Sequence, residues 1–159
     1  MLARSPAHPP AARQVTSAPA LPSELGRRDP TERSFLALCI ALPQLGGPAL
    51  AELDLEADLT SDVVRRAATH LRTHLHSPAE GLDELHDSEL VALIRELAVR
   101  AAALTSASRR DFEIERLQLA LARLGREIAN ARAGGTAIEE LAGRRGELRR
   151  RLDVLMEQV

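Results

Sequence analysis

Residues 109–159 read RRDFEIERLQ LALARLGREI ANARAGGTAI EELAGRRGEL RRRLDVLMEQ V, and this stretch predicts two long amphipathic helices that fold back on each other. Its apolar residues recur at alternating steps of three and four, which is typical of a coiled-coil-like seam. Gly134 and Gly135 lie between the two patterns and can supply the positive φ that ends a helix. Thr136, with Glu139 three residues later, predicts a capping box at the start of the second helix.

Reflecting the chain about the two glycines places the apolar residues of one helix opposite those of the other. The predicted seam consists of Ile114, Leu117, Leu121, Leu124, Ile128, Ile138, Leu141, Leu148, Leu152 and Leu155. Arg145 falls in this seam, so its side chain must extend to solvent or find a partner. Since two helices alone have only a thin core, we expect this hairpin to lean on something else.

Two regions precede the hairpin, and together they predict an all-α protein with a disordered N-terminal tail. Residues 1–28 hold five of the nine prolines and predict a disordered Pro/Ala-rich linker. Residues 29–106 predict a small helical bundle, and residues 107–159 form the terminal hairpin. The helices expected in the bundle span about 29–42, 48–53, 62–76 and 87–104.

Local signals mark where these helices begin. Asp29 and Pro30 suit the start of the first helix, which is apolar nearly all round and therefore expected at the centre of the bundle. Pro43 should end it, and a turn at Gly46-Gly47-Pro48 should precede a short second helix. An acidic connection follows at 54–58, after which Thr60 or Ser61 should cap the third helix.

The last helix of the bundle and the first helix of the hairpin also carry capping signals at their starts. Asp87 is expected to cap the fourth helix of the bundle. Ser108 with Asp111 predicts a capping box at the start of the first hairpin helix.

Composition excludes several classes of function. The chain of 159 residues has a net charge of −2, which argues against a general nucleic-acid binder. The single Cys39 rules out a disulfide framework and fits a reducing compartment. No apolar stretch reaches the roughly 20 residues that a membrane span needs. We therefore expect a cytoplasmic protein that neither spans a membrane nor binds nucleic acid sequence-specifically.

No residue pattern predicts a catalytic centre, a metal site or a cofactor. His70 and His74 lie one turn apart, but the third and fourth ligands of a metal site are missing. Arg65 and His70 fit the spacing of a helical-bundle ribonuclease motif, which two residue types can match by chance. The run Arg149-Arg150-Arg151 is most simply a solvated helix face.

Two stretches resemble the helicase-binding C-terminal domain of bacterial replicative DNA primase. Residues 32–43, ERSFLALCIALP, are similar to the opening helix of that domain, in which an acidic residue precedes a Leu-rich helix and a proline. The other stretch begins at Glu115-Arg-Leu-Gln-Leu119 and continues past Gly134-Gly135 and Ile138-Glu-Glu-Leu141 to Leu155. It looks like the terminal helical hairpin of the same domain. The resemblance covers about residues 30–159.

The resemblance implies recruitment rather than catalysis by this segment. Such a domain docks on the N-terminal collar of the hexameric replicative DNA helicase and brings RNA primer synthesis to the bacterial replication fork. The zinc ribbon and the catalytic core of a primase are absent from this sequence, so primer synthesis would belong to a longer protein. Whether Met1 is a true start is left open.

Apolar and basic side chains off the seam are the candidates for contacts with a partner, although the apolar ones could instead pack on the bundle. These candidates are Phe112, Leu119, Arg123, Arg126, Arg144, Arg149, Val154 and Met156. Two other functions stay open. The chain could be a free-standing hairpin protein that dimerises, or a small helical ribonuclease that uses Arg65 and His70.

Overall fold

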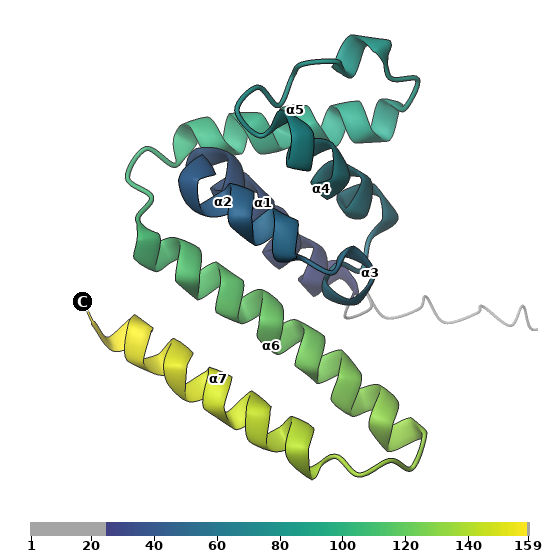
Figure 1. Cartoon of the computed structure of the whole chain (residues 1–159), viewed down its shortest axis with the longest axis vertical. Coiled ribbons are helices and arrows are strands. Elements are labelled where there is room, and N and C mark those ends of the chain that lie inside the picture. The colour runs from purple at the N-terminus through teal and green to yellow at the C-terminus, as the bar shows by residue number, and fades with distance from the viewer. Residues whose placement is uncertain (1–24, 159) are drawn as a thin grey trace, which may run out of the picture.

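The computed structural model describes residues 25–158, and within this range the chain is all-α, with no strand (Figure 1). The predicted fold class is therefore confirmed. The α-helices are α1 (Leu25–Ala41), α2 (Pro43–Glu52), α3 (Leu55–Asp58), α4 (Asp62–His74), α5 (Ser88–Ala103), α6 (Arg109–Ala133) and α7 (Glu139–Glu157), with a short 3₁₀ helix at Leu82–Glu84.

Helix α1 lies at the centre of the bundle, as its apolar sequence predicts. It packs against α2, α4, α5 and α6, and its residues Phe35 to Cys39 are buried. The ring of Phe35 meets that of Phe112 from α6, with 5.7 Å between the ring centroids. Phe112 and Leu119 belong to the same hydrophobic core as side chains of α1, α2, α4 and α5. Helix α6 is therefore part of the bundle as well as the partner of α7.

The first helix begins earlier than the sequence suggests. Helix α1 starts at Leu25, so residues 25–28 are helical and not part of the predicted linker, whereas residues 1–24 lie outside the described range. The predicted start at Asp29 is wrong because Pro30, which lies inside the helix, removes only one backbone hydrogen bond close to the helix end.

Helix α2 runs straight through the predicted turn. It begins with Pro43 at its first position and contains Gly46, Gly47 and Pro48, so the expected short helix at 48–53 is wrong. The reason is tertiary. A Cβ atom on Gly46 would lie 2.4 Å from the carbonyl oxygen of Cys39 and 2.5 Å from its Cα. Gly46 is therefore the contact at which the backbones of α1 and α2 come together, and its role is packing rather than turning.

The acidic connection at 54–58 contains a short helix and is held to α1. The Asp54 carboxylate caps α3 by accepting hydrogen bonds from the backbone N–H groups of Glu56 and Ala57, both at 3.2 Å. Thr60 does not cap α4. Its hydroxyl and its N–H instead donate to Oε1 of Glu32, at 2.6 and 2.9 Å. Glu32 is only 1% exposed, so this carboxylate fixes the α3–α4 loop against the core.

The predicted caps of α5 and α6 are confirmed. The Asp87 carboxylate accepts from the N–H of Leu90, and Ser108 with Asp111 forms a reciprocal capping box. The hydrogen bonds from Ser108 lower the pKa of Asp111 below its ordinary value. These caps depend only on neighbouring residues, which explains why the sequence reveals them.

The turn after α6 uses one of the two glycines in the predicted way. Gly135 has φ of +69°, whereas Gly134 keeps a right-handed helical conformation. The N–H of Thr136 donates to the carbonyl of Ala131 at 2.9 Å, and that of Gly135 to Arg132 at 3.3 Å, which is a Schellman motif. Thr136 is thereby part of the end of α6. The predicted cap of α7 by Thr136 is wrong, because α7 begins at Glu139 with Ile138 preceding it.

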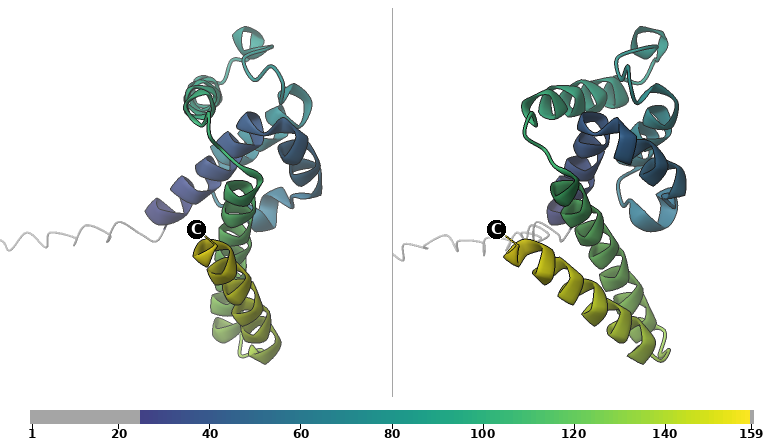
Figure 2. Two further views of the ribbon diagram at one scale, coloured as in Figure 1. Left: turned by 90° about the vertical axis from the view of Figure 1, so that its left-hand side faces the viewer. Right: turned by 60° about the vertical axis from the view of Figure 1, so that its left-hand side comes forward.

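Helix α7 returns along α6 on the side away from the bundle (Figure 1, Figure 2). At the open end of this helix pair, the Arg110 guanidinium of α6 donates to the carbonyl of Leu155 at 2.8 Å. Leu117, Leu124, Ile128 and Leu152 are buried between the helices, and the other apolar seam residues are half-buried. Arg145 is exposed. None of the helices in residues 25–158 is both long and apolar enough to cross a membrane.

Candidate interaction surface on the last two helices

Helix α7 leaves most of its surface uncovered. It packs chiefly on α6, and of its residues only Leu152 is buried. The side chains of Val154 and Met156 are 53% and 54% exposed, so two of the predicted apolar contact residues are free to meet another molecule. A helix with one buried residue gains little stability from its own packing, and its exposed side is the first place to look for a partner.

A largely apolar hollow lies beside these residues at the open end of the helix pair. It has a volume of about 470 Å³ and is lined by Glu113, Arg150, Arg151, Val154 and Leu155. Two of the three consecutive arginines thus stand next to apolar surface. This arrangement suits a partner protein that presents an apolar side chain next to an acidic one.

Phe112 and Leu119 are not available to a partner in this structure. Their side chains are 2% and 3% exposed, and both pack in the core of the bundle. Their assignment as partner contacts is therefore wrong. Each lies off the seam because α6 has a second apolar face, which covers α1.

Arg123 and Arg126 make their contacts within the chain. Nη1 of Arg123 lies 3.2 Å from Oδ1 of Asp58, and its Nε donates to Glu127 at 2.8 Å. The hydrogen bond to Glu127 is the main reason that the pKa of Arg123 is raised. Nη2 of Arg126 donates to the carbonyls of Ala57 and Asp58. The two arginines thus hold the end of α3 against α6, and their contact with a partner stays a prediction.

Arg144 and Arg149 remain exposed on α7, as a partner-binding role requires. Nε of Arg149 lies 3.3 Å from Oδ1 of Asp153, one turn further along the same helix. An exposed pair of this kind contributes only a few tenths of a kcal/mol, so Arg149 can exchange it for another acidic partner.

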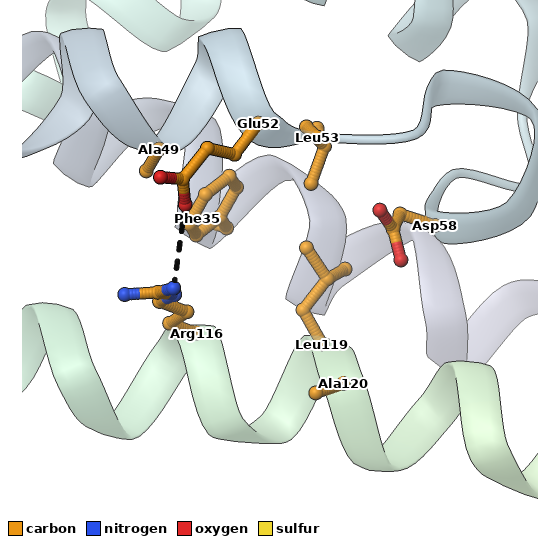
Figure 3. Close-up of a pocket in the computed structure, with 8 residues that line it drawn as sticks. All are labelled: Phe35, Ala49, Glu52, Leu53, Asp58, Arg116, Leu119 and Ala120. Carbon is orange, nitrogen blue, oxygen red and sulfur yellow. Dashed lines mark ion pairs between the residues drawn. The ribbon is translucent and has the colours of Figure 1, made fainter.

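An open pocket beside the core offers no catalytic arrangement. It measures about 190 Å³ and lies between α1, α2 and α6, with Phe35 and Leu119 in its wall (Figure 3). Glu52 and Arg116 face each other across it, 3.6 Å apart. Both side chains are more than half exposed, so the pair lies at the mouth of the cavity. No Ser, Cys or His is among the residues that line it.

The histidine pair on α4 is occupied by local contacts. The rings of His70 and His74 stack with 4.4 Å between their centroids. Nε2 of His70 lies 2.9 Å from the carbonyl oxygen of Pro78, and Nδ1 of His74 lies 2.8 Å from the hydroxyl of Thr73. No group of three or more potential metal ligands comes together among the described residues.

Arg65 and His70 do not form one site. Five residues along an α-helix correspond to a rotation of about 140° between the two side chains. Nε of Arg65 donates to the carbonyl of Leu59, and its Nη1 lies 3.5 Å from Glu56. Each side chain thus has its own structural partner on a different side of α4.

The buried Cys39 and the half-buried Glu115 have raised pKa values. Burial raises the pKa of the Cys39 thiol to about 12, so the thiolate needed for nucleophilic chemistry is scarce at neutral pH. Burial also raises the pKa of Glu115, against the opposing influence of Arg100. Neither group opens into a cavity described above, so both belong to the packing of the protein.

Comparison with known protein families, with curated proteins and with solved structures finds no significant match to this chain. The function is therefore inferred from the residues of this chain. Sequence reasoning missed the basic groove that Arg132 and Arg145 border between α6 and α7. The signal was present, because Arg145 is the one charged residue in an otherwise apolar seam pattern.

Proposed function

We propose that this chain is a non-enzymatic recruitment domain, the helicase-binding C-terminal region of a bacterial replicative DNA primase. The partner is the N-terminal collar of the hexameric replicative helicase, and the role is to bring RNA primer synthesis to the replication fork. The proposal rests on the resemblance of residues 32–43 and 115–155 to that domain. The order of elements, a helical bundle followed by a long α6 and a returning α7, supports it.

The observation that carries the proposal is the exposure of α7. A helix of 19 residues with one buried side chain, and with Val154, Met156 and several arginines in solvent, has a face available for a protein partner. The bundle adds a charge contrast, because residues 30–108 contain twelve acidic and six basic residues whereas residues 109–159 contain nine and eleven. Opposite charge on two parts of one domain favours a defined docking orientation.

The test is complex formation with the replicative helicase of the same organism. The chain contains no Trp or Tyr, so absorbance from aromatic residues in a mixture comes almost entirely from the helicase. In sedimentation velocity we expect the helicase boundary to shift when the chain is added at micromolar concentration, and we expect the helicase ATPase rate to change. The absence of both effects would refute the proposal.

Dimerisation is the second candidate function, because Val154 and Met156 would also suit a second copy of α7. Sedimentation of the chain alone separates the two. A stable dimer that the helicase does not dissociate, and that does not bind the helicase, favours a free-standing dimerisation or scaffold protein.

A further inference from the structure

A groove lies between α6 and α7 on the surface of the helix pair. It consists of two adjoining hollows of about 430 and 300 Å³ that share Arg145 and Arg149. Its apolar and small lining residues are Leu121, Ala122 and Ile128 of α6 with Ala142 and Gly146 of α7. Small side chains in the floor allow another backbone to approach closely.

The polar residues of the groove are all basic. Arg132, Arg145 and Arg149 line it, and no acidic residue does. Within residues 30–158, Arg132 and Arg145 have neither an ion pair nor a side-chain hydrogen bond. Arg149 has the exposed pair with Asp153. Three arginines beside an apolar strip, two of them with no acidic partner in that range, match an occupant that presents acidic side chains beside an apolar face.

Gly146 leaves open space in the groove. A Cβ atom at this position would have nothing within 4 Å, so the packing of this chain does not require glycine there. Glycine in a helix interior is destabilising relative to alanine. A backbone can therefore approach α7 closely at Gly146, which lies in the groove, whereas Gly143 has equal open space but lines no part of it.

We infer that this groove receives an acidic amphipathic helix of the protein partner. An α-helix is about 10 Å across and can lie between two neighbouring helices with its apolar side on Leu121, Ala122 and Ala142, which keep exposed surface in the groove. The first 23 residues of the chain contain no acidic residue and so lack the complementary charge. The inference rests on the proposed function for the source of the helix, since the groove belongs to the surface offered to the helicase.

The experiment measures the affinity of the full chain and its variants for the replicative helicase at two salt concentrations. Arg145→Glu, and separately Arg132→Glu, should weaken binding roughly ten-fold or more and reduce its salt dependence. Arg95→Glu is the charge-matched control, because Arg95 is exposed on α5 away from the groove, and it should change affinity less than about two-fold. Circular dichroism should show unchanged helix content, since all three arginines are exposed.

The two glycines of α7 provide a matched pair. Gly143→Ala and Gly146→Ala should both raise the melting temperature, because neither Cβ meets another atom. Gly143 lines no part of the groove, so its variant should bind normally, whereas Gly146→Ala should bind several-fold more weakly.

The outcomes separate the two proposals. Normal binding by Arg145→Glu, Arg132→Glu and Gly146→Ala overturns the groove while the proposed function stands. No binding by the unmodified chain overturns both. Two further outcomes overturn the acidic helix as the occupant. One is that poly-glutamate in a random coil fully displaces the chain from the helicase. The other is that the chain alone forms a dimer that Arg145→Glu dissociates.

Discussion

Replacing Gly46 by alanine tests the closest contact in the bundle. The new Cβ would lie 2.4 Å from the carbonyl oxygen and 2.8 Å from the carbonyl carbon of Cys39. Both are backbone atoms inside the central helix α1, so no side chain can rotate out of the way. Helix α2 would have to withdraw by about 1 Å to restore an ordinary contact.

The size of the loss in stability depends on the side chains that α2 buries. Its residues Ala49 and Leu50 are buried against the core, and a gap of ~1 Å forfeits a quarter to a half of each affected dispersion contact. Overpacking of this kind costs about 1–3 kcal/mol or more, partly offset by the ~1 kcal/mol by which alanine favours a helix over glycine. We expect Gly46→Ala to lower the free energy of unfolding by about 2 kcal/mol.

The neighbouring glycine is the control. A Cβ on Gly47 would lie 3.8 Å from Cδ2 of Leu75, an ordinary contact, so Gly47→Ala should raise the free energy of unfolding by roughly 0.5–1 kcal/mol. Urea unfolding followed by far-UV circular dichroism measures both. If Gly46→Ala is as stable as Gly47→Ala, then α1 and α2 do not approach at Gly46 and the packing described above is incorrect.

The remaining predictions concern the α6/α7 pair. Leu152→Asp places a charge at the one buried position of α7 and should lower the free energy of unfolding by at least ~2 kcal/mol. In hydrogen exchange, the amides of α7 should lose protection while those of α1 and α5 stay protected. Equal loss of protection in all of these helices would show that α7 and the bundle unfold together. Val154→Asp, at an exposed position on the same helix, should leave the exchange pattern unchanged. Ser108→Ala should cost about 1 kcal/mol near neutral pH through loss of the α6 cap. Because the pKa of Asp111 is lowered in the folded state, its part of this stability is present above the unfolded pKa and is lost as pH falls through the lowered value. The difference between Ser108→Ala and the unmodified chain should therefore shrink in acid, and a pH-independent difference would exclude Asp111 from the cap.

Features that depend on neighbouring residues could be predicted from the sequence. The caps at Asp87 and at Ser108 with Asp111 form as expected, since each uses donors and acceptors within three residues. The positive φ near residues 134 and 135 is also local, although only the structure assigns it to Gly135. The apolar periodicity of 114–155 correctly identifies residues that are buried or half-buried between α6 and α7.

Features that depend on residues of a neighbouring element in the fold could not be predicted from the sequence. Gly46, Gly47 and Pro48 are turn signals in isolation, but the approach of α2 to Cys39 makes a glycine inside a helix the better solution. For the same reason the sequence does not reveal that Glu32, a charged residue, is a buried acceptor for Thr60.

The candidate interaction surface divides in the same way. Sequence alone determined an all-α chain, its long paired helices and the set of side chains outside the seam, because helical periodicity fixes which residues share a face. Only the tertiary structure decided that Phe112 and Leu119 face the bundle, that Arg123 and Arg126 hold α3, and that Val154, Met156 and Arg145 stay in solvent. The physical reason is that burial depends on which element covers a face, and periodicity carries no information about that element.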